Sequence, residues 1–491
     1  MRRSLAILIA LTSTAALAQA PQPPLNSPPP AALKGAKKLP PQWEATAREI
    51  YKTAVETPTV ADAKRAGENL KLANYLAGKL KEAGWSESDI HVLPYTSVPG
   101  VETGALIARW PAAGTPTKKP ILILAHMDVV DALPSDWTTD PFKLVEKDGY
   151  FYGRGSSDDK GGLVPSMVAL MKLRASGFKP DRDIVLLFTG DEETQGKGAE
   201  LGATEWRKWT EAEFALNADA GGGGFTRDGK PLGFGLQTSE KTYQTYVFRV
   251  RNPGGHSSRP RPDNAIYDLA DALKKLQAHR FEPMLNETTR VYFTERAKQE
   301  GDSALGKAMR AWVANPNDGA AADLIEANPL EVGLTRTRCV ATRLKGGHAD
   351  NALPQLAEAT VNCRIMPGVE PKVVEAELKQ VVGPKVEVTA DADAGRPTPV
   401  SPLRADVVEA YTKAVHARFP DQPIIPQMSA GATDGLEFRA RGIPVYGVEG
   451  SWGVSPDDER AHGKDERNPV QGLWDDVFHW ESMIRDLAGG R

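Results

Sequence analysis

The chain has few cysteines, no large excess of charge and no long apolar run beyond its N-terminus. Cys339 and Cys363 are the only two cysteines among 491 residues. They are too few for a disulfide framework or a cysteine-based zinc site, and whether they pair stays open. A formal net charge of −4 gives no indication of a nucleic-acid partner. No segment after the first twenty residues reaches the length of a membrane span.

Three common catalytic motifs are also absent. There is no Gly-x-Ser-x-Gly elbow and no His-Glu-x-x-His helix, so neither a serine hydrolase of that type nor a zincin is supported. The glycine-rich stretch 153–162 contains Lys160, but no Gly-Lys-Ser/Thr closes it. A phosphate-binding loop is therefore excluded at this position.

The N-terminus has the pattern of a secretory signal. Arg2 and Arg3 precede a short apolar run, and small residues lead to Ala18-Gln19-Ala20. We expect a signal segment at 1–20, cleaved after Ala20, and a periplasmic or secreted protein. An uncleaved anchor is the alternative, but the apolar run is too short to span a bilayer. Many prolines at 21–41 predict an extended linker.

The length and the order of apolar segments predict two domains. A chain of 491 residues is too long for one ordinary core. Short apolar runs alternate with helical patterns in the first half, which is typical of an α/β domain with a mostly parallel sheet. The expected strands are 103–109, 120–125, 183–189 and 213–217, with a helix at 162–175.

The pattern changes near residue 240. Polar and apolar residues alternate over 242–250, as in a half-exposed strand, and amphipathic helices and further strands follow. An irregular polar stretch at 285–335 is interpreted as a helical insertion. The α/β pattern resumes after 396. We therefore predict a catalytic domain formed by 42–238 and 396–491, interrupted by a smaller α+β lid or dimerisation domain at 239–395.

Polar side chains follow the apolar run that ends at residue 125. His126 and Asp128 point to the same side of an extended chain, because side chains alternate along a strand. His126 can thus ligate a metal while Asp128 supports the ring. Sites in open α/β sheets form at the carboxyl ends of strands, which favours this location. Taken alone, a hydrogen-bonded structural pair is about as probable as a ligand.

Four further stretches supply candidate ligands and a base. Asp158 lies in the glycine-rich loop and can bridge two cations with its two oxygens. Glu192 and Glu193 follow an apolar strand, where one carboxylate can ligate while the other transfers protons. Asp219 ends another expected strand, and His462 precedes the final helix. Each has an ordinary alternative: a solvated acidic pair, a turn aspartate or a surface histidine.

Together these segments resemble the M20 family of metallopeptidases, which includes carboxypeptidases, dipeptidases and aminoacylases. The resemblance covers nearly the whole mature chain, and the run Trp137-Thr138-Thr139-Asp140-Pro141-Phe142 places it nearest the Gly-X carboxypeptidase and dipeptidase branch. The matching segments are His126-Met127-Asp128-Val129-Val130, Gly153 to Gly161, Asp191-Glu192-Glu193, Asp219 and His462-Gly463.

The resemblance implies a zinc-exopeptidase-like catalytic domain with two Zn²⁺ ions, which Co²⁺ or Mn²⁺ could replace. It assigns His126 and Asp219 to one ion and Glu193 and His462 to the other, with Asp158 bridging. Glu192 would be the general base, and Asp128 would tune His126. Asn217 also lies near the family's ligand position, but Asp219 carries the charge that a ligand needs.

Further positions are implied for substrate binding. His256, in Asn252-Pro253-Gly254-Gly255-His256-Ser257-Ser258, matches a histidine that stabilises the oxyanion in the partner's active site of dimeric members. A homodimer through the inserted domain is expected on this basis, with a monomer as the alternative. The resemblance also places Asn351, Arg364 and Thr433 at substrate contacts, where Arg364 could bind a carboxylate with two hydrogen bonds.

Three functions are compatible with this pattern. The leading hypothesis is a secreted metal-dependent exopeptidase that cleaves dipeptides or the C-terminal residue of short peptides. An N-acyl-amino-acid amidohydrolase would use the same metals and base. A non-catalytic peptide-binding protein on the same scaffold is disfavoured, because Glu192 and all five candidate ligands are present.

Overall fold

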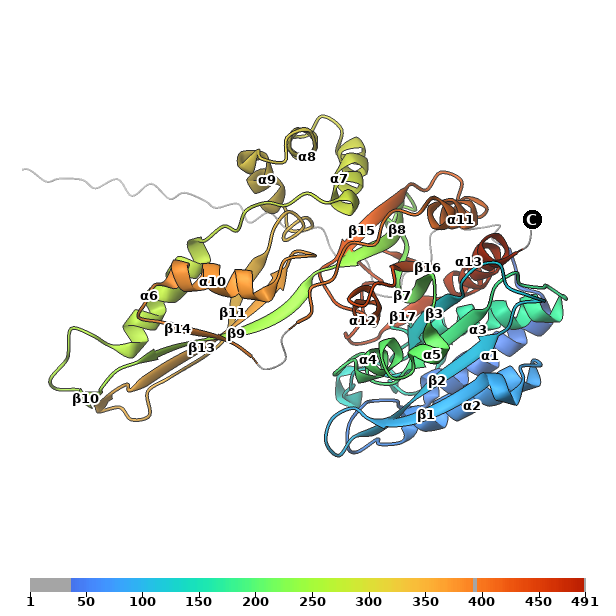
Figure 1. Cartoon of the computed structure of the whole chain (residues 1–491), viewed down its shortest axis with the longest axis horizontal. Helices are drawn as coiled ribbons and strands as arrows, with labels where there is room; N and C mark the ends of the chain where they lie inside the picture. The colour runs from blue at the N-terminus through green and yellow to red at the C-terminus, as the bar shows by residue number, and fades with distance from the viewer. Residues whose placement is uncertain (1–36, 392–394, 490–491) are drawn as a thin grey trace, which may run out of the picture.

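A computed structural model of the chain describes residues 37–391 and 395–489. The predicted signal segment, 1–20, and most of the predicted linker, 21–41, lie outside the described residues. The described residues form four sheets, of eight, four, three and two strands, together with the helices that cover them (Figure 1). None of the described helices is long and apolar enough to cross a membrane.

The larger sheet has eight strands in the order β1-β2-β6-β3-β7-β16-β8-β15. β6, β3, β7 and β16 run parallel to one another, and β15 runs parallel to β8, whereas β1 and β2 are antiparallel. This mixed, mostly parallel sheet confirms the predicted α/β architecture. The strands are β1 (Ile90–Thr96), β2 (Glu102–Trp110), β3 (Ile121–His126), β6 (Ile184–Thr189), β7 (Phe214–Phe225), β8 (Pro231–Glu240), β15 (Ile424–Ser429) and β16 (Val445–Val454).

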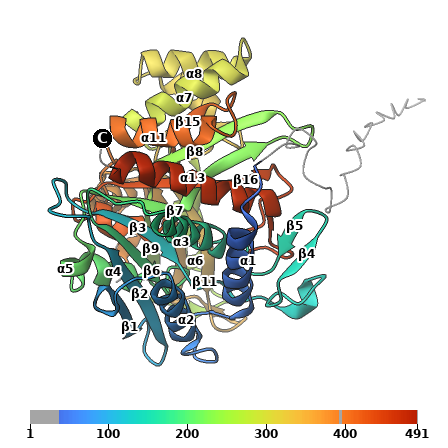
Figure 2. The ribbon, with the colours of Figure 1, turned by 90° about the vertical axis from the view of Figure 1, so that its right-hand side faces the viewer.

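Helices cover both faces of the larger sheet, which explains why β3 and β6 are buried along their whole length. The face in Figure 2 carries five helices, and their apolar residues form one core with the sheet. They are α1 (Pro41–Glu56), α2 (Glu68–Glu82), α3 (Lys160–Ala175), α11 (Ala405–His416) and α13 (Val470–Ala488). The opposite face carries α4 (Lys197–Ala203), α5 (Arg207–Thr210) and α12 (Gly435–Arg439), packed in a second core.

The smaller sheet has four antiparallel strands in the order β11-β13-β9-β14. β9 alternates buried and partly exposed residues, because α6 and α10 cover one face only. Cys339 and Cys363 lie opposite each other on β11 and β13 and form a disulfide. These elements are α6 (Ala265–Ala278), α10 (Pro371–Val382), β9 (Thr242–Arg251), β11 (Arg338–Gly346), β13 (Leu356–Ile365) and β14 (Glu387–Ala390).

Three helices occupy the stretch that was expected to be a helical insertion. They form an apolar cluster of their own around Phe293 and Trp312. Figure 1 shows them above the two sheets, and α7 packs against β15 of the larger sheet. The helices are α7 (Glu287–Glu300), α8 (Ala304–Ala314) and α9 (Gly319–Glu326).

Two small sheets fix loops that carry candidate site residues. β5 (Tyr150–Tyr152) pairs with β4 (Val145–Lys147) and with β17 (Arg467–Pro469). This pairing brings the loop after residue 152 next to the loop before residue 467. β10 (Gly255–His256) pairs with β12 (Ala352–Leu353) at the end of the smaller sheet that lies away from the larger one (Figure 1).

Candidate active site

The candidate site lies where β3 and β6 end, next to the middle of β7. These neighbouring strands are parallel, so their carboxyl ends meet at one edge of the sheet. His126 is the last residue of β3, and Glu192 and Glu193 follow β6. Asp219 does not end its strand as predicted, because β7 continues to Phe225, but it lies just beyond the part of β7 that pairs with β3. The alternation of strands and helices in the sequence therefore places these side chains together in space.

Five predicted ligands converge at this edge, and Asp158 lies between the two histidines. His126 Nε2 lies 3.0 Å from Asp158 Oδ1, and His462 Nε2 lies 3.3 Å from Asp158 Oδ2. Asp219 Oδ1 is 3.6 Å from His126 Nε2, on one side of the cluster. Glu193 Oε2 is 2.8 Å from His462 Nε2, on the other side. The two oxygens of Asp158 thus face different halves of the cluster.

The donor set fits divalent cations. Ligand atoms of His126, Asp158 and Glu193 lie within 4.8 Å of one another, and so do those of His126, Asp159 and Asp219. Imidazole nitrogens and carboxylate oxygens are ligands of zinc and of related divalent ions. So many buried carboxylates also repel one another, and bound cations would remove that repulsion.

Asp159 was not among the predicted ligands. Its side chain is 2 % exposed, and its Oδ2 accepts a hydrogen bond of 3.2 Å from the backbone N–H of His126. Burial, together with the negative charge of Asp219, raises the pKa of Asp159 well above its usual range. The adjacent acids Asp158-Asp159 are visible in the sequence, but the sequence does not show which of the two would ligate a metal.

Asp128 contacts both the segment of the two glutamates and the ring of His126. Its carboxylate oxygens accept hydrogen bonds of 3.1 Å from the backbone N–H groups of Glu192 and Glu193. The ring nitrogen Nδ1 of His126 lies 3.0 Å from the backbone carbonyl of Asp128 and 3.6 Å from its carboxylate. The side chain of Asp128 therefore orients the segment of the two glutamates more directly than the ring.

The charges of the cluster shift the protonation of its members. Burial raises the pKa of Asp219 to about 6, although His126 opposes the shift. Burial also raises the pKa of Glu192 well above its usual range, and the charge of Asp219 adds to the effect. Hydrogen bonds to Asp158 and Glu193 raise the pKa of His462 to about 10. Without a cation, the cluster thus holds protons on groups that would ligate in their basic forms.

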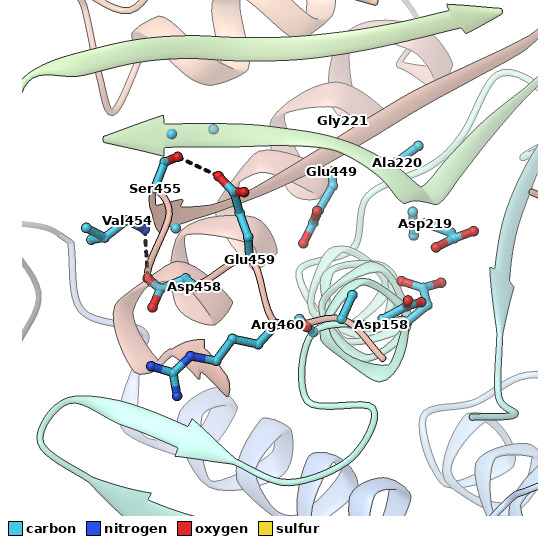
Figure 3. A pocket seen from close by; sticks show the side chains of 17 residues that line it. Asp158, Asp219, Ala220, Gly221, Glu449, Val454, Ser455, Asp458, Glu459 and Arg460 are labelled. Atoms are coloured by element: carbon cyan, nitrogen blue, oxygen red, sulfur yellow. Dashed lines mark hydrogen bonds between the residues drawn. The ribbon is translucent and has the colours of Figure 1, made fainter. Parts of the chain in front are cut away.

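Three cavities are lined by residues of the cluster or by Glu192 beside it. Glu192 lines a cavity of about 450 Å³ together with Tyr243 and Thr433. Asp219 and Thr433 line a second cavity of about 330 Å³, to which α7 contributes Thr289 and Tyr292. Figure 3 shows a third cavity of about 470 Å³, with Asp158 and Asp219 at one end and Glu449 pointing into it. The cluster is therefore accessible to a substrate with groups on either side of the reacting bond.

Arg364 and Thr433 lie near this group of cavities. Arg364 Nη1 donates a hydrogen bond of 3.1 Å to the backbone carbonyl of Ala430, and its guanidinium lies 4.7 Å from the ring centre of Tyr243. No carboxylate in the described part of the chain pairs with it. Thr433 Oγ1 is hydrogen bonded to Glu240, Asn217 and Gly435.

His256 and Asn351 do not join the cluster within one chain. Both are exposed at the β10–β12 end of the smaller sheet, and the backbone N–H of Ser257 donates to the carbonyl of Asn351 at 3.0 Å. In Figure 1 this end points away from the larger sheet. Their predicted roles would require an active site other than the one in their own chain.

Comparisons with known proteins agree with this arrangement. The model of peptidase family M20/M25/M40 matches residues 122–486. The human N-fatty-acyl-amino acid synthase/hydrolase PM20D1 is 30% identical over 368 residues, which cover 72% of each chain. The probable carboxypeptidase S-like 2 of Dictyostelium discoideum is 28% identical over 376 residues, covering 75% of this chain and 72% of that protein.

Solved structures share the fold. The M20 family metallo-carboxypeptidase Sso-CP2 from Sulfolobus solfataricus aligns with a TM-score of 0.64 and 20% identity, covering 90% of this chain and 98% of that one. Human carnosine dipeptidase 1 aligns with a TM-score of 0.63 and 16% identity, covering 91% and 96%. Because the family model matches about three quarters of its length, the chain belongs to peptidase family M20/M25/M40 and is a hydrolase of the metallopeptidase type.

Proposed function

We propose that this protein hydrolyses the amide bond next to a terminal amino acid that has a free carboxylate, in dipeptides and at the C-terminus of short peptides. The observation that supports this most directly is the position of Asp158 between His126 and His462, at 3.0 and 3.3 Å. That arrangement offers two adjacent cation positions beside cavities large enough for a small substrate.

The proposed cofactor is a pair of Zn²⁺ ions, with Co²⁺ or Mn²⁺ as substitutes. His126 and Asp219 would hold one ion and Glu193 and His462 the other, and Asp158 would bridge them. When bound, two divalent ions lower the pKa of water and polarise the carbonyl of the scissile bond. The carboxylate of Asp219, whose pKa is raised to about 6, would be ionised in that state, because the cation replaces the proton.

Glu192 is the proposed general base. No hydrogen bond engages its carboxylate in the described part of the chain, and it lines a cavity beside the cluster. Asp128 holds the backbone of residues 192 and 193, which fixes where the carboxylate of Glu192 lies. Glu192 accepts the proton of the attacking water and later delivers it to the nitrogen of the leaving amine.

Arg364 is the proposed partner of the substrate's carboxylate. Burial lowers the pKa of its guanidinium, and no carboxylate of the described chain neutralises it. An unpaired, half-buried arginine has a strong preference for an anion that can accept two hydrogen bonds. The free carboxylate of a terminal amino acid provides that anion.

N-acyl amino acids are a second candidate substrate class. The relative with 30% identity is described as an N-fatty-acyl-amino acid synthase/hydrolase, whereas a relative with 28% identity is described as a probable carboxypeptidase. Both substrate classes present an amide bond next to an amino acid carboxylate, so the same residues would serve both. The difference would lie in the group on the other side of the amide.

Two further proposals concern the state of the protein. Export to the periplasm or to the medium rests on the predicted signal segment at 1–20. A homodimer through the smaller sheet rests on His256 and Asn351, which lie exposed at its end and far from their own chain's cluster. In such a dimer each smaller sheet would present His256 to the active site of the partner.

The decisive experiment replaces the proposed base. Glu192→Gln keeps the size of the side chain but removes its capacity to take up a proton. We expect turnover of dipeptides to fall by at least about 10²-fold, while the content of bound zinc, measured by atomic absorption, stays at the wild-type value. Comparable turnover in this variant would refute the assignment. A parallel screen of dipeptides and N-acyl amino acids, with chelator-treated protein as the control, separates the two substrate classes.

A further inference from the structure

Thr433 has no hydrogen-bonding position left for a substrate. Its Oγ1 donates to Glu240 Oε1 at 2.5 Å and accepts from Asn217 Nδ2 at 3.0 Å and from the backbone N–H of Gly435 at 3.1 Å. A hydroxyl group provides one donor and two acceptor positions. All three positions of Thr433 are therefore occupied within the chain.

Glu240 connects Thr433 to the junction between the two sheets. It is the last residue of β8, and only Lys241 separates it from β9 of the smaller sheet. The side chain of Glu240 is fully buried, receives Gln237 Nε2 at 3.2 Å and lies 2.8 Å from Arg439 Nη1. Glu240, which accepts the hydrogen bond of the Thr433 hydroxyl, is thus itself fixed by Gln237 and Arg439.

Asn217 connects Thr433 to the cluster. It is fully buried on β7, two residues before Asp219, and its Oδ1 accepts a hydrogen bond of 3.3 Å from the backbone N–H of Asp219. A continuous series of hydrogen bonds therefore runs from Glu240 through Thr433 and Asn217 to the backbone of a proposed metal ligand. We call these three side chains the threonine bridge.

We propose that Thr433 is a positioning residue that fixes the segment of Asp219 relative to the sheet junction, and that its hydroxyl does not contact the substrate. This inference rests on the proposed function of the cluster, and it replaces the substrate contact predicted for Thr433 from the family resemblance. Recognition of the substrate's carboxylate then falls to Arg364 and to the backbone of residues 430–432, without the threonine hydroxyl.

Thr433→Val and Thr433→Ser test the proposal as a matched pair. Valine keeps the shape but removes all three hydrogen bonds, whereas serine keeps them. We expect the valine variant to bind zinc about 10- to 100-fold more weakly in a competition titration with a chromogenic chelator. Removing a residue that holds a metal ligand in place typically lowers metal affinity by this factor. With saturating metal, its KM should equal that of the wild type. The serine variant should match the wild type in both measurements.

A raised KM with unchanged zinc affinity in Thr433→Val would show that the hydroxyl binds substrate, and would overturn the proposal. Unchanged values of both quantities would overturn it as well. Should the valine variant fail to fold in a thermal melt, Thr433→Ala takes its place in the same comparison. The zinc titration needs no turnover, so its result stands even if Glu192→Gln refutes the proposed reaction.

A double-mutant cycle tests the bridge itself. Asn217→Leu removes the link to Asp219, and Thr433→Val removes the link to Glu240. If both act through one series of hydrogen bonds, the double variant should lose no more zinc affinity than the weaker-binding single variant. Losses that multiply would mean that the two residues act independently, which the proposal does not allow.

Discussion

Glu466 holds the loop of Asp158 in place, so its removal should weaken both the fold and the proposed metal centre. Its carboxylate is fully buried and accepts five hydrogen bonds from a segment more than 300 residues away in the chain. The donors are Arg154 Nη1 at 2.7 Å, Ser157 N at 2.8 Å, Gly155 N and Ser157 Oγ at 3.0 Å each, and Asp158 N at 3.1 Å.

The size of the effect follows from what Glu466→Gln leaves behind. The amide group keeps one acceptor oxygen but places an N–H₂ group against the donors that faced the other oxygen. Arg154 is 3 % exposed and would lose its charged partner, although it keeps its hydrogen bond to the carbonyl of Gly463. Breaking a buried ion pair costs about 3–5 kcal/mol. We expect Glu466→Gln to lower the free energy of unfolding by an amount at the lower limit, about 3 kcal/mol, because the amide keeps one oxygen that accepts hydrogen bonds.

Burial raises the pKa of Glu466, although Arg154 and the backbone donors oppose the shift. The ion pair therefore adds little net stability, and the cost of the substitution comes from the unpaired Arg154 and the unsatisfied donors. Two measurements check the prediction: urea unfolding of the metal-free protein and a zinc titration against a chelator. Zinc affinity should fall about 10- to 100-fold, because the backbone of Asp158 is no longer fixed.

Glu459→Gln is the control for this prediction. Glu459 is exposed, lies in the neighbouring loop and loses the same charge on substitution. The free energy of unfolding of the Glu459→Gln variant should differ from that of the wild type by no more than about 0.5 kcal/mol. If Glu466→Gln unfolds at the same urea concentration as the control and binds zinc equally well, the carboxylate does not organise the loop and the reasoning is wrong.

Two other predictions concern the smaller sheet and its junction. Reduction of the Cys339–Cys363 disulfide should lower the free energy of unfolding by about 3 kcal/mol. The two cysteines are separated by 24 positions, so the unfolded chain gains loop entropy when the bond is broken. Urea unfolding measures the change, with the Cys339→Ser/Cys363→Ser variant as the reference. Burial lowers the pKa of Lys241 to about 7, although Glu326 opposes the shift. Between this value and the ordinary lysine pKa of about 10.4, the unfolded chain binds one more proton than the folded chain, so Lys241 makes stability rise with pH over that window. In Lys241→Met, the free energy of unfolding should rise less between pH 7 and 10 than in the wild type, as measured by unfolding both proteins in parallel. An identical rise with pH in both proteins would contradict the lowered pKa of Lys241.

The interior of the larger sheet was predictable from the sequence, whereas several of its outer strands were not. β3 and β6 are continuous apolar runs, because helices cover both of their faces. β1 and β15 lie at the two edges of the sheet and contain Pro94 and Pro426, which interrupt a strand pattern. β11 is the edge strand of the smaller sheet and is mostly exposed, so no burial pattern marks it.

The converging ligands were predictable for a related reason. His126 ends β3, Glu193 follows β6, and Asp219 lies on β7 just beyond its pairing with β3, so the parallel order of these strands brings the three together. Glu466 carries no such signal, since it follows no strand and its partners at 154–158 become neighbours only through the pairing of β5 with β17. The same holds for Glu240, whose importance depends on three-dimensional contacts with Thr433 and Arg439.

The position of His256 shows a limit of a different kind. Its segment matches a family motif, so the type of residue and its chemistry could be inferred from the sequence. The sequence does not say whether His256 serves the active site of its own chain or that of a partner, because this depends on its distance from the cluster. Within one chain, His256 lies at the exposed end of the smaller sheet, remote from the cluster. A histidine there can act as an oxyanion donor only if a second copy brings its own cluster to that end. The proposed dimer and the proposed role of His256 are therefore one hypothesis, and a variant that stays monomeric while keeping full activity would remove both.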